Sequence, residues 1–378
     1  IDAWVRELLY SAIFQMKFLD KIPEHAIFNE SIEVAKILGH VGTGKYVTAI
    51  LHNIGRQGLR NISEIKEPIQ RLSIERSLPI WLIETLISQN GEEATRAMLE
   101  TINDAPKQSI RVNTTLASDE EVEQALAAEK FTTVKSRVAA HAYIVSGGHV
   151  ASSKAFHDGL LTLQDESAML PVESMRLTEN VKTILDAAAA PGGKTTQIAQ
   201  SVGENVTITA LDIHEHKIKL IQSNAERLHV TEKIRTRVLD ARKVPTEIEQ
   251  KFDRILVDAP CSGFGLLRRK PEIRYDKTLT DVENLAHLQF EILDSVSQNV
   301  TDNGMIVYST CTILRQENDD VITKFLLKHS DFELVPTQTS KNLKPNRSED
   351  VLHVYPNDYQ TDGFFVATLQ KKMSTDNV

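Results

Sequence analysis

The chain has 378 residues, enough for two or three compact units, and 41% of them are hydrophobic, as in an ordinary globular protein. Lysine and arginine number 43 against 52 aspartates and glutamates, which gives a net charge of −9. This balance disfavours a protein that holds nucleic acid by charge alone. Because no run approaches the ~20 apolar residues of a membrane span and no signal core opens the chain, we expect a cytoplasmic protein without membrane association.

The first part of the chain predicts a small all-helical domain, placed at residues 1–62. Apolar residues recur at spacings of three and four from Trp4 to Met16, and again within 32–38 and 47–54. The domain opens directly on an amphipathic run without capping residues. We therefore expect it to be N-terminally incomplete.

Residues 63–170 predict a helical linker followed by a small mixed α/β subdomain. The expected elements are a helical pair near 79–83 and 92–101, strands at 110–113 and 142–145, and a helix near 119–129.

From residue 181 short β-rich runs alternate with helical segments, which is typical of a parallel sheet covered by helices. The expected strands are 183–186, 206–212, 234–240, 252–258, 305–310 and a last one at 363–369. The sequence thus predicts a multidomain α and α/β protein whose last domain, residues 171–374, is Rossmann-like.

A loop of small residues follows the first strand of this domain and opens a helix. Its members are Ala188, Ala189, Ala190, Pro191, Gly192, Gly193 and Lys194. In open α/β sheets ligands bind at this place, because backbone N–H groups and the helix N-terminus converge there. The end of the loop resembles a phosphate-binding loop, but that pattern needs a glycine where Ala188 stands, so the match fails.

Aspartates end the next three strands: Asp212, Asp240 and Asp258. Each alone is most simply a strand-end or capping residue. Together, along one rim of the sheet, they suit a ligand with a nucleoside and a cationic centre, with Asp212 placed to accept hydrogen bonds from ribose hydroxyls.

Cys261 and Cys311 are the only cysteines, which excludes a disulfide framework or a four-thiolate zinc site, and we expect no bound metal. Each follows a predicted strand, the fourth and the fifth. A single cysteine is more often a buried small hydrophobe. Two of them at strand ends beside a cofactor loop predict a shared site.

Two thiols and a carboxylate suit the methylation of cytosine at carbon 5. That carbon is a poor nucleophile, so a thiolate must first add to carbon 6, and a second basic group must later help to remove the carbon 5 proton. Asp258 is the candidate that hydrogen-bonds the ring nitrogen. A free thiol has a pKa of about 8.5, so positive charge from Lys194 is expected to lower it. The residues alone leave open which thiol attacks.

Several segments resemble the motifs of RNA cytosine-C5 methyltransferases, in their RsmB/Sun branch. The segments are 189–195, 258–263 and 309–312, with further matches at 164–168, 268–274, 316–318 and 363–365. The helical N-terminus is similar to the NusB-like RNA-binding domain of the same branch.

The resemblance implies a class I methyltransferase domain that uses S-adenosyl-L-methionine to modify one cytidine of 16S ribosomal RNA. It implies that Cys311 is the nucleophile and that Cys261 assists release. The loop 188–194, Asp212, Asp240 and Asp258 would contact the cofactor or line its pocket. We expect a monomer.

A basic cluster follows the first cysteine motif: Arg268, Arg269, Lys270 and Arg274. We predict that it grips substrate phosphates, although a solvated charge run is the commoner meaning of such a cluster. Arg111, Lys135 and Arg137 are expected to extend the same patch.

Two rival interpretations remain open. One is a DNA cytosine methyltransferase, in which Cys261 would attack, and the other is a catalytically silent RNA-binding assembly factor. A transfer-RNA target also remains open. Comparing DNA with RNA substrates, and testing cofactor binding, would separate these alternatives.

Overall fold

The computed structural model describes residues 1–344 and 349–373, and its contacts divide the chain into a unit of residues 1–71 and a second unit from residue 72 onward. The first unit is helical, as expected. Its elements are α1 (Ala3–Phe18), α2 (Glu24–Leu38), α3 (Val41–Gln57), the short η1 (Ile62–Glu64) and the start of α4 (Pro68–Arg76). Its core takes Leu9 and Leu51 from the predicted apolar stripes and Phe28 from outside them, whereas Ile37 and Leu38, which the spacing places in a stripe, are exposed.

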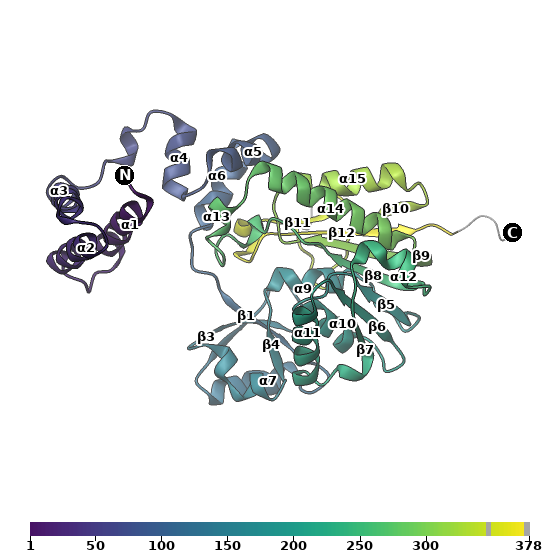
Figure 1. The fold of residues 1–378 in the computed structure, drawn as a ribbon. Helices are drawn as coiled ribbons and strands as arrows, with labels where there is room; N and C mark the ends of the chain where they lie inside the picture. The colour runs from purple at the N-terminus through teal and green to yellow at the C-terminus, as the bar shows by residue number, and fades with distance from the viewer. Residues whose placement is uncertain (345–348, 374–378) are drawn as a thin grey trace. The chain divides into compact units, whose positions relative to one another are not determined.

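The second unit begins with a helical pair and a four-stranded antiparallel sheet in the order β2-β3-β1-β4 (Figure 1). The pair is α5 (Ile80–Asn90) and α6 (Glu92–Thr101), and the strands are β1 (Gln108–Val112), β2 (Thr132–Lys135), β3 (Ala142–Ser146) and β4 (Leu161–Leu163). The helix α7 (Asp119–Ala128) starts at a capping box, in which Ser118 and Glu121 bond each other's backbone N–H.

The rest of the second unit is built on an eight-stranded sheet in the order β10-β12-β9-β8-β5-β6-β7, with β11 beside β12. The strands are β5 (Thr183–Asp186), β6 (Thr207–Asp212), β7 (Ile234–Val238), β8 (Phe252–Asp258), β9 (Val300–Thr310), β10 (Phe332–Val335), β11 (Leu352–Val354) and β12 (Phe364–Lys371). The strands β5 to β9 are parallel to one another, while β12 runs antiparallel to β9 and β10.

Helices cover both faces of this sheet (Figure 1). One apolar layer packs beneath α9 (Glu166–Glu173), α10 (Gly193–Ser201) and α11 (Glu215–Arg227). The other packs beneath α14 (Leu279–Ser297) and α15 (Asp319–Lys328). Short helices lie in the connections: α8 (Lys154–His157), α12 (Val244–Glu247), α13 (Ile273–Asp276) and α16 (Pro356–Tyr359).

The strand order reverses at β5. From β5 the chain proceeds to β6 and β7 on one side, then returns to β8 and β9 on the other. In such sheets the loops at the carboxyl ends of the strands diverge at this point and leave a crevice for a ligand. The Rossmann-like prediction is thereby confirmed. Within the described residues no helix is both long and apolar enough to cross a membrane.

Candidate active site

The small-residue loop lies between β5 and α10, at the crevice. Gly192 adopts φ +102°, a left-handed conformation that favours glycine, and a Cβ added there would lie 3.1 Å from the Cα of Ile221. A Cβ added at Gly193 would meet its nearest atoms, those of Gln164, only at 4.0 Å. Gly192 is thus required by the turn, whereas Gly193 leaves space for a ligand to approach the backbone.

The predicted aspartates Asp212 and Asp240 lie at the same edge of the sheet. Asp212 ends β6, is 8% exposed and accepts a hydrogen bond from the backbone N–H of His214 at 3.0 Å. Asp240 follows β7, and the guanidinium of Arg242 lies 2.7 Å from its carboxylate. Hydrogen bonds from Arg242 hold the pKa of Asp240 below its usual value. Both residues stay candidates for cofactor contact, and both have a cationic neighbour: Arg242 pairs with Asp240, and Lys217 Nζ lies 3.9 Å from Asp212 Oδ2.

Lys194 and Asp258 form an ion pair in the crevice. The Lys194 Nζ lies 2.7 Å from Asp258 Oδ2, and the hydroxyl of Ser309 donates to Asp258 Oδ1 at 2.8 Å. Burial opposes the charge on Lys194, but the neighbouring Asp258 carboxylate outweighs it, so the pKa of Lys194 is raised. Lys194 therefore places an ammonium group at the carboxyl edge of the sheet.

The two cysteines meet beside this ion pair. Cys261 Sγ and Cys311 Sγ are 3.2 Å apart, and both residues are half-buried. The hydrogen bond to Cys311 and burial raise the pKa of the Cys261 thiol well above its ordinary value, with further contributions from Cys311, Glu317 and Asp258. The two cysteines, which their positions at strand ends predict to share a site, thus form a close thiol pair.

Two buried carboxyl groups beside the site were not among the predicted site residues. Asp186 ends β5, accepts from the hydroxyl of Thr195 at 2.7 Å, and has its pKa raised to about 7 by burial. Glu317 lies six residues beyond Cys311 and is 0% exposed. The position of Asp186 at a strand end resembles that of the other aspartates and could have revealed it. Glu317 carries no comparable local signal beyond the motif match at 316–318.

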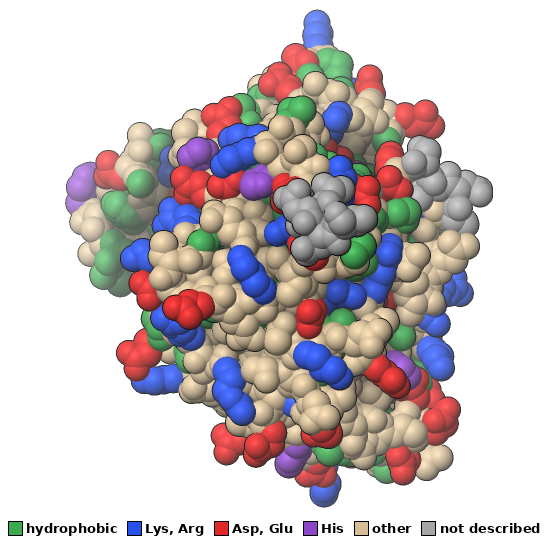
Figure 2. Space-filling view, turned by 90° about the vertical axis from the view of Figure 1, so that its right-hand side faces the viewer, with side chains coloured by type: hydrophobic (Ala, Val, Ile, Leu, Met, Phe, Trp, Pro, Cys, Tyr) green, Lys and Arg blue, Asp and Glu red, His purple; other side chains and the backbone are tan. Residues whose placement is uncertain are grey.

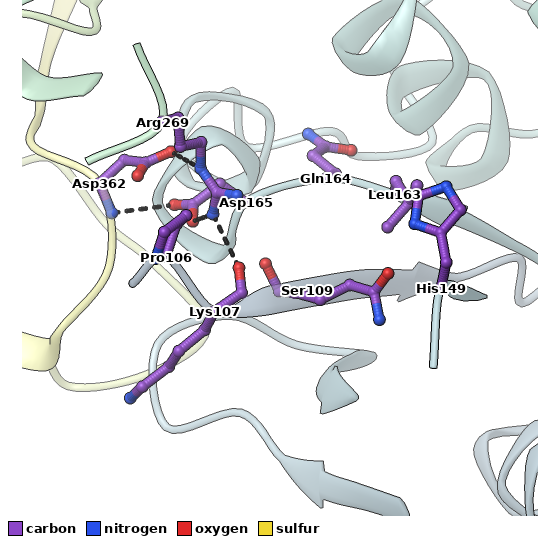
Figure 3. A pocket seen from close by; sticks show the side chains of 10 residues that line it. Pro106, Lys107, Ser109, His149, Leu163, Gln164, Asp165, Arg269 and Asp362 are labelled. Atoms are coloured by element: carbon purple, nitrogen blue, oxygen red, sulfur yellow. Dashed lines mark hydrogen bonds and ion pairs between the residues drawn. The ribbon is translucent and has the colours of Figure 1, made fainter. Parts of the chain in front are cut away.

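The basic cluster is largely engaged with the protein itself. Arg269 lies between two carboxylates, 2.7 Å from Asp165 and 2.6 Å from Asp362, at a pocket that also includes Lys107 and His149 (Figure 3). Burial raises the pKa of Asp362 to about 7. Arg269 therefore balances charge inside this pocket.

The neighbouring arginines also have protein partners. Arg268 donates to the backbone carbonyl of Pro356, and Arg274, only 7% exposed, donates to the carbonyl of Ile102 at 3.2 Å. Lys270 is exposed. Arg269 is exposed as well, but its guanidinium is paired with Asp165 and Asp362, so Lys270 is the exposed cation of the four for which the described residues supply no ion pair. On the face drawn in Figure 2, side chains of both charges are interspersed.

The expectation that Arg111 extends a surface patch is wrong. Its side chain is 4% exposed and points into the second unit, where it donates to the carbonyl of Gly193 at 2.8 Å and to the hydroxyl of Thr196 at 3.1 Å. It therefore connects β1 of the small sheet to the cofactor loop and has no access to a phosphate.

Comparison with known proteins gives three consecutive family matches. Residues 1–56 match the NusB family, residues 78–150 the ferredoxin-like domain of RsmF/B-like methyltransferases, and residues 175–370 the 16S rRNA methyltransferase RsmB/F family. The order and the extent of these matches agree with the helical, mixed and Rossmann-like parts of the fold.

Individual relatives cover nearly the whole chain. It is 39% identical to "Probable ribosomal RNA small subunit methyltransferase B" of Bacillus subtilis, over 98% of this chain and 84% of that protein. It is 34% identical to "Ribosomal RNA small subunit methyltransferase B" of Photorhabdus laumondii, over 97% and 82%.

Two solved structures share the fold. This chain is 29% identical to the chain in the crystal structure of PH0851, with a TM-score of 0.84, over 98% of this chain and 83% of that one. It is 22% identical to the chain in the crystal structure of NSun6 from Pyrococcus horikoshii with SFG, with a TM-score of 0.69, over 78% and 99%. The chain belongs to the RsmB/F family of S-adenosylmethionine-dependent 16S rRNA methyltransferases, with a NusB-family helical N-terminus, a ferredoxin-like middle domain and a C-terminal methyltransferase domain.

Proposed function

We propose that the protein transfers a methyl group from S-adenosylmethionine to carbon 5 of a cytidine in 16S ribosomal RNA, through a covalent bond between Cys311 and carbon 6 of the base. The observation that carries the proposal is the thiol pair, 3.2 Å apart, beside the Lys194–Asp258 ion pair at the carboxyl edge of the sheet. A silent assembly factor would have no need for this arrangement.

The residues of the crevice fit the cofactor. Gly193 leaves the backbone open to close approach, and the buried carboxylate of Asp212 is an acceptor suited to ribose hydroxyls. The N-terminus of α10 adds backbone N–H donors for a carboxylate. When bound, S-adenosylmethionine supplies an electrophilic methyl group there.

The protein's own groups would carry the remaining chemistry. The Cys311 thiolate forms a bond to carbon 6, and the ring nitrogen takes up a proton that the Lys194 ammonium group supplies through the Asp258 carboxyl group. With the cofactor bound, carbon 5 would form a bond to the methyl group with the electron pair of the former C5–C6 double bond, leaving the electron pair of the broken S–C bond on the cofactor sulfur. Cys261 in its thiolate form accepts the carbon 5 proton, the bond from Cys311 to carbon 6 breaks, the ring nitrogen returns its proton to the Asp258–Lys194 pair, and the double bond is restored.

The charges around the two thiols support these roles. Cys311 is one of the groups whose charge raises the pKa of Lys194, so ammonium and thiolate would stabilise each other. The pKa of Cys261 is raised by its hydrogen bond with Cys311 and by burial, and the carboxylates of Glu317 and Asp258 add to this. A thiolate beside a cation suits the nucleophile, whereas a sulfur of raised pKa is a strong base in its thiolate form and suits the proton acceptor.

Incubating the protein with methyl-labelled cofactor and 16S rRNA, followed by nuclease digestion and mass spectrometry, tests the proposal. We expect labelled 5-methylcytidine with the wild-type protein and none with Cys311→Ser. Transfer RNA and duplex DNA serve as comparison substrates. Label on another base, or on another atom of cytidine, would contradict the proposed reaction.

A further inference from the structure

We propose that Glu317 is a positioning residue for the release step: its buried carboxylate holds the loop that carries Cys261 against the end of the strand that leads to Cys311. The inference rests on the proposed function for the role of the release step, but the contacts that support it are independent of that function.

The carboxylate of Glu317 accepts two hydrogen bonds from Ser262, the residue after Cys261. Its Oε1 accepts from the backbone N–H of Ser262 at 2.8 Å, and its Oε2 accepts from the Ser262 hydroxyl at 2.5 Å. The amide of Gln289, on α14, donates to Oε1 at 3.0 Å. Glu317 is 0% exposed, so water cannot replace these partners.

The same network reaches the residues on either side of the thiol pair. Gln289 also donates to the carbonyl of Pro260 at 2.9 Å, so both chain neighbours of Cys261 are held. The Ser262 hydroxyl lies 3.0 Å from that of Thr312, which follows Cys311. Loss of the carboxylate would therefore leave Cys261 less firmly placed against Cys311, 3.2 Å away, while the backbone hydrogen bonds from Ala259 and Gly265 still hold the ends of the loop.

The backbone of Glu317 is itself anchored. The hydroxyl of Tyr308, buried on β9, donates to the Glu317 carbonyl at 2.6 Å and lies 3.2 Å from Gln289 Oε1. Strand β9, helix α14 and the turn η6 (Arg315–Glu317) thus fix the carboxylate in place. Such fixed support of a reacting group is what precise geometry requires.

Electrostatics gives Glu317 a second effect. The groups that face Cys261 are the Cys311 thiol, the carboxylates of Asp258 and Glu317, and the Tyr308 hydroxyl, with Lys194 paired to Asp258. Burial raises the pKa of Glu317, while the hydrogen bonds that it accepts favour its charged form. A carboxylate here disfavours the Cys261 thiolate, so Cys261 does not compete with Cys311 for carbon 6, and its thiolate, once formed, is a stronger base.

The first test measures the thiol without any RNA. In a Cys311→Ala background Cys261 is the only cysteine, and its alkylation by iodoacetamide across pH reports its pKa. We expect Glu317→Gln, which keeps the shape of the side chain, to lower that pKa by roughly one unit by removing a nearby negative charge. Glu333→Gln, at an exposed position on β10, is the matched control and should leave it unchanged. An unchanged pKa in Glu317→Gln would overturn the electrostatic effect.

The second test measures release with both cysteines present. Glu317→Gln should lower kcat about tenfold, equivalent to ~1.4 kcal/mol, with KM changed less than about twofold, and should accumulate the protein–RNA adduct. Ser262→Ala, which removes one of the same hydrogen bonds, should show the same pattern more weakly. A fall in kcat without adduct would overturn the assignment to release. If the wild-type protein forms no 5-methylcytidine while the pKa of Cys261 still shifts, the proposed function fails and the positioning role of Glu317 stands.

Discussion

Arg111 is a buried charge that stabilises the protein and does not lie where it could bind RNA. Its guanidinium donates to the carbonyl of Gly193, to Thr196 Oγ1 and to the side-chain oxygens of Gln164 and Gln200. All four acceptors are neutral. Burial, with a smaller effect from Arg227, lowers its pKa to about 9. We take Arg111→Met as the perturbation, because methionine keeps the apolar stem and removes the donors.

The expected loss of stability follows from these contacts. Each hydrogen bond contributes about 1 kcal/mol net. Removing the buried charge returns part of its desolvation penalty, so we expect a net loss of roughly 1–3 kcal/mol. For a unit of this size that corresponds to a fall in Tm of roughly 2–6 °C. Because Gly193 belongs to the cofactor loop, affinity for S-adenosylmethionine should weaken as well.

Thermal unfolding, cofactor titration and the salt dependence of RNA binding form the assay. Lys135→Met is the matched control for Tm and for cofactor affinity, since Lys135 lies on the same small sheet and is exposed. Arg111→Met should lower Tm and leave the salt slope unchanged. A Tm like that of the wild-type protein, together with a salt slope reduced by ~0.9, would refute the structural role and restore the phosphate contact.

Three further predictions concern the pH dependence, the RNA surface and the cofactor loop. Because burial raises the pKa of Asp186 from 3.8 to about 7, the folded protein keeps a proton that the unfolded chain releases, and this contribution makes stability fall as pH rises across that range. Asp186→Asn should remove up to ~4 kcal/mol of this decrease in the free energy of unfolding, at ~1.4 kcal/mol per pKa unit. Urea unfolding measured across pH tests this, and a pH dependence equal to that of the wild-type protein would contradict it. Lys270→Ala should weaken RNA binding and reduce its salt slope by ~0.9 without changing Tm, and an unchanged slope would remove Lys270 from the RNA surface. Gly192→Ala should lower the free energy of unfolding by ~1–3 kcal/mol and weaken cofactor binding, because φ is positive there and the added Cβ would meet the backbone of Ile221. Gly203→Ala, with open space around it, should change neither quantity in the same thermal and calorimetric measurements.

The fold was predictable where the signal is local. Strands such as β5 and β8 contain short apolar runs, at residues 184–185 and 255–257, that lead directly into an aspartate, and α7 opens with its own capping box. Strand β2 escaped prediction because most of its residues are exposed, and β4 because it has only three residues. Both strands depend on pairing with distant neighbours, which no local pattern of hydrophobic residues reveals.

The residues of the site also fall into two groups, those that local motifs predict and those whose roles depend on distant partners. Lys194, Cys261 and Cys311 lie in short motifs at strand ends, so the topology of the sheet brings them together. Arg269 was interpreted as a surface charge because its partner Asp362 lies 93 residues away, and the role of Glu317 depends on Ser262, 55 residues before it. Burial and pairing across such separations decide whether a charged residue serves the interior or the solvent.

The central claim is that Cys311 attacks the base and Cys261 assists its release. The most direct measurement incubates the wild-type protein, Cys261→Ala and Cys311→Ala with S-adenosylmethionine and 16S rRNA, and resolves protein–RNA adducts on a denaturing gel. We expect an adduct to accumulate with Cys261→Ala and to be absent with Cys311→Ala. An adduct that accumulates with Cys311→Ala and is absent with Cys261→Ala would contradict the assignment and exchange the roles of the two thiols.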